Sequence, residues 1–184
     1  MGKITVSEWM SLDGVYDADL MDQWWNPYHS DSRGKHIQAG IAACEVMLYG
    51  RTTYEMLAPY WSSQKNNEMG VAAKLNGVRK YVVSTTLKKP EWENSVVIKG
   101  NPIEAITRLK QEIGGEILVT GSATLAQSLL EAGLVDELRI LVQPIIMGKG
   151  KRFFKDGMRT GLELLRTETL DKGVVAEYYK PVKA

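Results

Sequence analysis

Glycine and hydroxyl residues recur where predicted strands give way to predicted helices. The first such junction, residues 48–55, reads LYGRTTYE. Gly50 lets a ligand approach the backbone closely, and the N–H groups at a helix start attract phosphate. Arg51 adds a planar, permanently charged donor fork that suits phosphate oxygens. The alternative interpretation is a capping box formed by Thr52 and Glu55, with Arg51 as an ordinary surface residue.

Two further junctions have the same character. Residues 82–86 read VVSTT, and three hydroxyls at a strand end suit a nucleotide ribose or phosphate, although turn formation explains them equally. Residues 118–125 read LVTGSATL, which suits a pyrophosphate, with capping by Ser122 as the alternative. No G-x-G-x-x-G or G-x-x-x-x-G-K-[ST] loop is present, so neither a Rossmann nor a P-loop site is supported. Three such strand ends in one sheet indicate one extended, phosphate-bearing ligand.

The elements that must position these junctions alternate between strands and helices. Apolar runs predict strands at residues 3–10, 46–49, 80–84, 95–99, 117–119 and 138–146. Helical periodicity predicts helices at 31–44, 52–57 (stopped near Pro59), 68–75, 102–113 and 123–132. Strands at 162–170 and 174–180 follow, joined by a hairpin turn at 171–173. This order predicts a three-layer α/β fold with a mostly parallel central sheet and an antiparallel C-terminal hairpin, in which ligands gather at the carboxyl ends of the strands.

Length and composition narrow the class of protein. The 184 residues contain no linker-like stretch, so we expect a single domain over residues 1–184. With 44% hydrophobic and 24% charged residues, the chain is neither collagen-like nor disordered. The net charge of +1 gives no reason to expect a polyanionic partner. Cys44 is the only cysteine, no Cys/His cluster has metal-ligand spacing, and no apolar stretch is long enough to span a membrane, so we expect a cytoplasmic protein without a metal.

Several single residues and segments have two interpretations. Trp24, Trp25 and Trp61 suit stacking on a flat heterocycle, but core filling explains them equally. His29 and His36 are lone histidines seven residues apart, for which surface positions are favoured over proton transfer or metal binding. The basic segment 149–155 favours a solvated loop over a site for a substrate phosphate or nucleic acid.

The chain resembles the dihydrofolate reductase-like superfamily, and within it the branch that contains the C-terminal reductase domain of riboflavin-biosynthesis deaminase/reductases and its stand-alone bacterial relatives. The resemblance runs in order through SLDG at residues 11–14, GRTTYE at 50–55, VS at 83–84, Gly121 at a helix start, LVDEL at 134–138 and PIIMGKG at 144–150. Two departures stand out. Gly121-Ser122 replaces the two adjacent glycines of the folate enzymes, and their helical carboxylate corresponds to Gly34, with Asp31 the nearest acid. Folate reduction itself is therefore not expected.

The resemblance implies a reductase that binds NADPH and transfers a hydride to a small heterocyclic substrate, pteridine-like or pyrimidine-like. The first junction would contact the cofactor phosphates, the second the adenosine side with its 2′-phosphate, and the third the pyrophosphate and nicotinamide half. The cofactor-binding residues expected on this basis are Gly50, Arg51, Thr52, Thr53, Ser84, Thr85, Lys99, Gly121, Ser122, Ala123, Thr124 and Leu125.

Asp13 is the candidate proton donor beside hydride transfer. A carboxyl group shielded from water has a raised pKa and can act as an acid. Asp13-Gly14 also suits a plain turn, and Asp13 could instead orient a substrate or brace the loop.

Members of this branch usually form homodimers, and we expect one here. The alternative hypothesis is a nucleotide-binding regulator or sensor that keeps the cofactor cleft without catalysis, because the folate-type carboxylate is missing. Nucleic-acid binding through residues 149–155 is the weakest hypothesis, since the overall charge is balanced.

Overall fold

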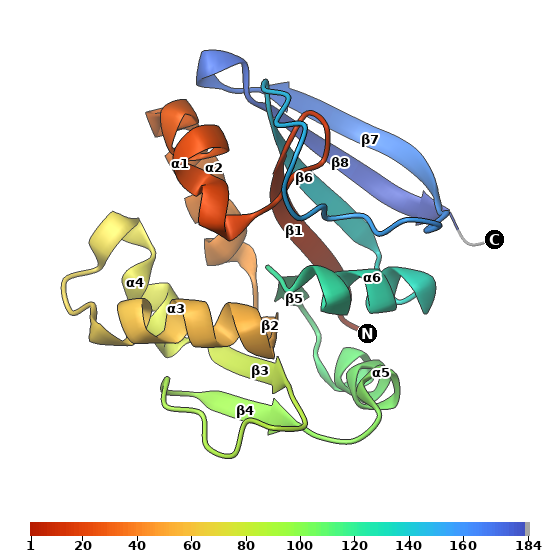
Figure 1. The fold of residues 1–184 in the computed structure, drawn as a ribbon. Coiled ribbons are helices and arrows are strands. Elements are labelled where there is room, and N and C mark those ends of the chain that lie inside the picture. The colour runs from red at the N-terminus through yellow and green to blue at the C-terminus, as the bar shows by residue number, and fades with distance from the viewer. Residues whose placement is uncertain (183–184) are drawn as a thin grey trace.

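The computed structural model describes residues 1–182 and is built around one eight-stranded sheet (Figure 1). Its strand order is β4-β3-β2-β5-β1-β6-β8-β7. The strands are β1 (Lys3–Ser11), β2 (Val46–Gly50), β3 (Arg79–Val83), β4 (Ser95–Ile98), β5 (Glu116–Val119), β6 (Glu137–Gln143), β7 (Gly161–Thr169) and β8 (Val175–Val182). Every pairing from β4 to β6 is parallel, whereas β8 runs antiparallel to both β6 and β7. The predicted mostly parallel sheet with an antiparallel C-terminal hairpin is confirmed.

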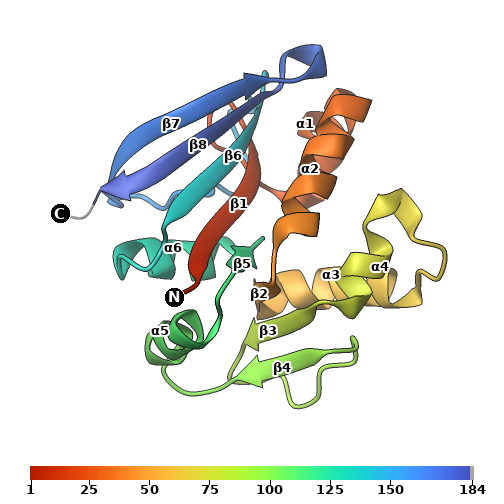
Figure 2. The same ribbon diagram turned by 180° about the vertical axis from the view of Figure 1, so that it is seen from behind.

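Helices cover both faces of the sheet, which gives the predicted three layers (Figure 2). The helices are α1 (Met21–Trp24), α2 (Asp31–Ala43), α3 (Arg51–Ser63), α4 (Ala72–Gly77), α5 (Pro102–Glu112) and α6 (Ala123–Glu131), with short 3-10 turns at Ala18–Leu20, Asn26–Tyr28, Glu68–Gly70 and Asp171–Gly173. The alternation of side chains along β2 explains the layers. Val46 and Leu48 pack in the core with α5 and α6, whereas Met47 and Tyr49 pack in a second core with α3 and α4.

Three predicted elements differ from their predicted bounds by more than two residues. The helix expected to stop near Pro59 continues to Ser63, because its buried face, which includes Tyr54 and Ala58, favours the helix more than the one hydrogen bond lost at proline opposes it. The helix expected at 68–75 is a 3-10 turn followed by α4, since Met69 and Gly70 both have positive φ. The strand expected to reach residue 146 ends at Gln143, because Pro144 has no N–H for the ladder.

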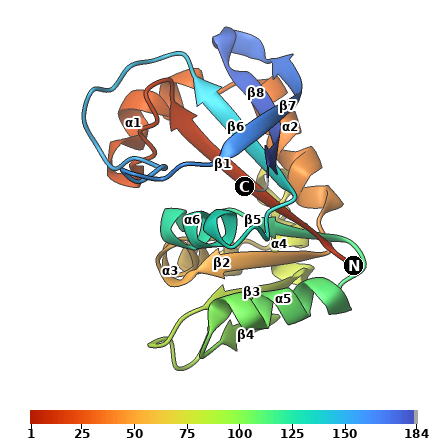
Figure 3. The same ribbon diagram turned by 90° about the vertical axis from the view of Figure 1, so that its right-hand side faces the viewer.

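The sheet opens between its two central strands at the carboxyl edge. β1 pairs with β5 only over Lys3–Val6, but it pairs with β6 as far as Ser11. Figure 3 shows β1 and β6 continuing past the end of β5. On the side that faces β5, β1 therefore has no neighbouring strand from residue 7 onward. This leaves a gap in the middle of the sheet's carboxyl edge, the edge at which ligands bind in such sheets.

We expect Leu129→Ala to destabilise the protein by about 2–5 kcal/mol, because Leu129 is fully buried between α6 and the sheet and truncation leaves a cavity. Urea unfolding followed by circular dichroism measures the change. Met56→Ala on the exposed face of α3 is the control and should shift stability by less than about 0.5 kcal/mol. Equal effects of the two changes would contradict the placement of this core.

Candidate functional site

The three junctions predicted from the sequence meet at one edge of the sheet. β2 lies between β3 and β5, so the ends of these strands are neighbours. The Gly50 N–H donates to the Gly121 carbonyl at 3.0 Å, which joins the first junction to the third. Arg51 Nη1 donates to Thr86 Oγ1 at 3.0 Å, which joins the first junction to the second. Lys99 is exposed just after β4, the next strand along.

Two of these positions have room only for glycine. A Cβ added to Gly50 would lie 2.4 Å from Ser122 Oγ, and one added to Gly121 would lie 2.5 Å from Thr53 Oγ1. Gly121 also has a φ of +102° and precedes a cis peptide bond to Ser122. The close approach of β2 and β5 therefore depends on both glycines.

The starts of α3 and α6 lie close together beside Arg51. Gly50 and Ser122 occupy the N-cap positions of these 13- and 9-residue helices, and in the described residues Ser122 makes no side-chain cap bond and Gly50 has no side chain to make one. At the start of α6, the Ala123 N–H donates to the Tyr16 hydroxyl at 3.0 Å. The capping box at Thr52 is wrong, because α3 begins at Arg51 and Glu55 faces Arg51 at 3.8 Å. The remaining N–H groups of two helix starts beside an arginine fit a pyrophosphate.

Two side chains expected to contact the cofactor are engaged elsewhere in the structure. The Ser84 hydroxyl accepts hydrogen bonds from the N–H groups of Thr86 and Leu87 at 3.1 and 2.9 Å. It therefore forms the turn, as the alternative interpretation had it, and leaves Thr85 exposed. The Leu125 side chain is buried in the core between α6 and the sheet, so only its backbone is available to a ligand.

Asp13 does not have the raised pKa expected of a proton donor. Its carboxylate accepts from Ser11 Oγ at 2.6 Å and from the N–H groups of Met147 and Gly148 at 3.0 and 2.8 Å. The Ser11 hydrogen bond and then these backbone bonds lower the pKa of Asp13 to about 2. Asp13 is therefore ionised at neutral pH, and it braces residues 147–148 against the end of β1.

An aromatic pocket of about 510 Å³ lies between α2, α3 and the sheet, next to the third junction at Thr120. Trp25 and Trp61 line it, whereas Trp24 is buried in a core. Trp9 stacks on Trp25 with ring centroids 4.1 Å apart. Core filling is confirmed for Trp24 and Trp25, whereas stacking of Trp61 on a heterocycle stays a prediction. The pocket suits a flat ring.

The α2 wall of this aromatic pocket carries no carboxylate at the position that corresponds to the acid of the folate enzymes. Gly34 lines the pocket there, and Asp31, one turn away at the start of α2, also lines it but is exposed.

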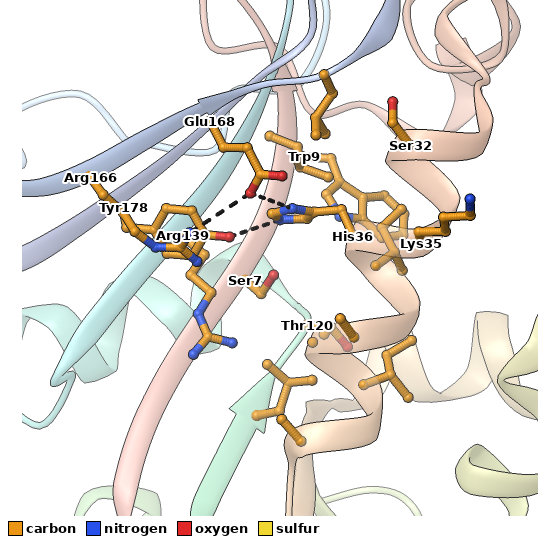
Figure 4. Close-up of a pocket in the computed structure, with 18 residues that line it drawn as sticks. Ser7, Trp9, Ser32, Lys35, His36, Thr120, Arg139, Arg166, Glu168 and Tyr178 are labelled. Carbon is orange, nitrogen blue, oxygen red and sulfur yellow. Dashed lines mark hydrogen bonds and ion pairs between the residues drawn. The ribbon is translucent and has the colours of Figure 1, made fainter.

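A second cavity, of about 550 Å³, lies on the other side of α2, and several charged and polar side chains line it. We call it the hairpin groove, because it runs between α2 and the strands β6, β8 and β7 (Figure 4). It shares five lining residues with the aromatic pocket, so the two cavities adjoin beneath α2. These residues are Trp9, Lys35, Ile37, Ile41 and Thr120.

His36 lies in the hairpin groove, so the expectation of a surface position for it is wrong. Its Nε2 lies 3.2 Å from the Tyr178 hydroxyl, and its Nδ1 lies 3.4 Å from Glu168 Oε2 (Figure 4). Burial lowers the pKa of His36, and the Glu168 carboxylate opposes that effect. His29 is exposed, as expected.

Sequence reasoning missed Tyr178 and Glu168. Both lie in strands where tyrosine and glutamate are unremarkable, and no local motif connects them to a histidine more than 130 residues earlier. Only the packing of the hairpin beside α2 brings the three side chains together.

Residues 1–182 contain neither a metal-ligand cluster nor a membrane-spanning helix. No group of three or more His, Cys, Asp or Glu side chains there could hold a metal ion. None of the helices described is both long and apolar enough to cross a membrane.

Comparisons with known proteins agree on the fold. Residues 2–176 match the family described as the RibD C-terminal domain. YyaP of Bacillus subtilis (strain 168), described as uncharacterized, is 30% identical over 138 residues, which are 73% of each chain. A pyrimidine reductase-like protein from Corynebacterium diphtheriae has a TM-score of 0.69 at 14% identity, over 99% of this chain and 92% of its own. Dihydrofolate reductase from Enterococcus faecalis, solved with NADP(H), has a TM-score of 0.66 at 15% identity, over 98% and 97%. The resemblance predicted from the sequence is confirmed.

We expect Asp13→Asn to lower the urea midpoint of unfolding at pH 7, because the amide cannot replace the charged acceptor of two backbone N–H groups. The pKa of Asp13 in the folded state is below its unfolded value, so the stabilisation is present above about pH 4 and is lost as the pH falls toward 2. The difference between variant and wild type should therefore shrink over that range. Asp156→Asn, at an exposed loop position, is the control and should show no such trend.

Proposed function

The chain belongs to the RibD C-terminal domain family, and on that premise we propose that it is an NADPH-dependent reductase of a small heterocyclic substrate. One observation carries the proposal. The starts of α3 and α6 meet at the Gly50–Gly121 hydrogen bond, directly beside the aromatic pocket at Thr120. An anionic cofactor bound at those helix starts would direct its reactive ring toward that pocket.

We assign each part of the cofactor to a described feature. The pyrophosphate would bind the backbone N–H groups at the starts of α3 and α6. Arg51, half-exposed and already held toward Thr86, would contact the 2′-phosphate on the adenosine side. The nicotinamide would enter the gap between β1 and β5, where Trp9 and Thr120 border the aromatic pocket.

The aromatic pocket is the proposed substrate site. NADPH supplies the hydride when it is bound, and the chain's own residues position the acceptor. Trp9 and Trp61 line the pocket and offer apolar surface to a flat ring of pteridine-like or pyrimidine-like shape. The Trp25 ring lies between Trp9 and the Arg33 guanidinium and supports this wall.

A nucleotide-binding regulator is the second candidate, and one observation favours it. Gly34 lines the pocket where the folate enzymes would have their acid, so no carboxylate of α2 reaches the substrate from that position. The two candidates differ in turnover, because a regulator binds NADPH but never oxidises it.

We expect NADPH to raise the thermal midpoint of the wild-type protein, since a ligand at 100 times its Kd stabilises by about 2.7 kcal/mol. Arg51→Ala should weaken NADPH binding about tenfold or more, because a charge-assisted hydrogen bond is worth at least about 1.5 kcal/mol. NADH binding should change less than about threefold, since NADH lacks the 2′-phosphate. Fluorescence titration of both cofactors measures the difference.

Arg79→Ala is the matched control, because Arg79 is exposed at the amino end of β3, the edge opposite the site. It should leave both affinities unchanged. Equal losses of NADPH and NADH in Arg51→Ala would remove Arg51 from the 2′-phosphate site, and no binding of either cofactor to the wild type would refute the proposed function.

We further propose that the reductase is a homodimer and that its interface covers strand β7. This strand forms the edge of the sheet and is exposed at every position. Leu162, Leu164 and Leu165 are 41%, 55% and 47% exposed there. An exposed apolar edge strand with unpaired N–H and C=O groups is a surface that proteins normally cover.

We expect Leu164→Lys to convert the dimer to a monomer, because a charge would be buried without a partner in the interface. Sedimentation velocity at several protein concentrations measures the change. Met56→Lys on exposed α3 is the control and should remain dimeric. A wild-type protein that is monomeric at every concentration would refute the dimer.

A further inference from the structure

The reduction of a C=N or C=O bond needs a proton as well as a hydride, and the groups already assigned do not provide one. Asp13 is held ionised by its hydrogen bonds, and Asp31, the acid of α2 that lines the aromatic pocket, is exposed to solvent at the start of that helix. A donor shielded from water therefore has to be another group that lines the aromatic pocket or the adjoining hairpin groove.

The hairpin groove contains one cluster with the organisation of a proton relay. The Tyr178 hydroxyl lies 3.2 Å from Nε2 of His36, whose other nitrogen faces Glu168 at 3.4 Å (Figure 4). A titratable hydroxyl, a histidine and an orienting carboxylate in series are the arrangement by which enzymes hold and pass on a proton. Each member comes from a different element: β8, α2 and β7.

The charges around this cluster come from every element packed against it. Lys35 lies on α2 beside His36, and Arg139 enters from β6, bonded to Glu116 and Glu137. From β7, the Arg166 guanidinium lies 3.6 Å from the centre of the Tyr178 ring. Burial raises the pKa of Tyr178, and the Arg166 cation opposes that effect because it stabilises the negative charge that Tyr178 acquires when it gives up its proton.

We propose that Tyr178 is the proton donor of the reduction and that His36, oriented by Glu168, returns the proton to it; this rests on the proposed function. The hydride carries two electrons from NADPH to the acceptor carbon. The π electrons of the C=N or C=O bond move to the heteroatom, which takes the Tyr178 hydroxyl proton. Tyr178 then takes the Nε2 proton of His36, and the imidazole regains one from water. The sum is NADPH, one proton and the acceptor giving NADP+ and the reduced product.

The position of the groove supports this assignment. Trp9 and Thr120 line both cavities and border the gap proposed for the nicotinamide. A flat ring in the aromatic pocket can therefore direct a heteroatom past these residues into the hairpin groove, where Tyr178 lies. The acceptor this favours is a ring whose reducible C=N or C=O bond lies at its edge.

The relay gives a defined pH dependence. His36 must be protonated to return a proton, and burial lowers its pKa from the ordinary value of 6.5. Turnover should therefore rise as the pH falls below 6.5 and the imidazolium becomes populated. NADPH binding should not follow the same curve, because the cluster makes no contact with the cofactor site.

The test compares Tyr178→Phe with Tyr179→Phe. Tyr179 is the adjacent residue, but its side chain packs toward the opposite core and its hydroxyl bonds to Glu177. NADPH affinity is measured by fluorescence, and turnover by loss of NADPH absorbance with 9,10-phenanthrenequinone and 7,8-dihydropterin as probes, between pH 5 and 8. Tyr178→Phe should lower kcat at least about 100-fold, keep the NADPH affinity and lose the pH dependence. Tyr179→Phe should stay within about twofold of wild type in all three.

His36→Gln is the second variant, and it should keep NADPH affinity while its remaining turnover becomes independent of pH. If Tyr178→Phe or His36→Gln keeps the wild-type kcat and the wild-type pH profile, the relay is overturned. Loss of NADPH binding in both variants would also overturn it, because the cluster would then serve the cofactor site. A wild type that binds NADPH but reduces neither probe would refute the donor role and favour the regulator, whereas one that binds no NADPH would refute the proposed function itself.

Discussion

The carboxyl ends of β2 and β5 are joined by the hydrogen bond from the Gly50 N–H to the Gly121 carbonyl. A Cβ at Gly50 would lie 2.4 Å from Ser122 Oγ and one at Gly121 2.5 Å from Thr53 Oγ1, so glycine at both positions permits this contact. With the strands this close, the helices that follow them begin side by side. The proposed anion site would thus be a consequence of backbone packing, to which the side chain of Arg51 adds.

A second constraint acts on the other side of β5. Because β1 pairs with β5 only as far as Val6 but continues beside β6, the sheet has a gap between β1 and β5. This gap results from the strand pairing and not from any one side chain. Asp13 fixes the end of this strand by holding the N–H groups of Met147 and Gly148. The same hydrogen bonds, with that from Ser11, lower the pKa of Asp13, so its carboxylate is ionised and holds this loop in place.

The sequence predicts those features that depend on neighbours along the chain. The parallel β/α order, the strand-to-helix junctions after β2 and β5 and the hairpin turn follow from local patterns, and the structure confirms them. The second junction is not a strand-to-helix junction, because β3 is followed by a turn and then by β4. Features that depend on distant packing are not predictable in this way. Nothing local distinguishes Ser84 as a turn residue from Ser84 as a ligand, and His36 looks like a surface residue until the hairpin, more than 130 residues later, covers it. Pro59 remains inside α3 for a related reason, since tertiary burial outweighs a local signal.

Helix α2 determines that both cavities stay open. A helix with a continuous apolar stripe would pack down on the sheet and fill the space on either side. Arg33 is the only residue of α2 that is fully buried, and it donates to the Trp25 carbonyl and stacks on its ring. Ile37 and Ile41 pack against the cores, and two further contacts are polar: Ser32 accepts from the Asp171 N–H and Gln38 donates to the Met69 carbonyl. Since these bonds hold α2 at its edges, the space beneath it is left to the aromatic pocket on one side and the hairpin groove on the other, and one helix positions residues in both.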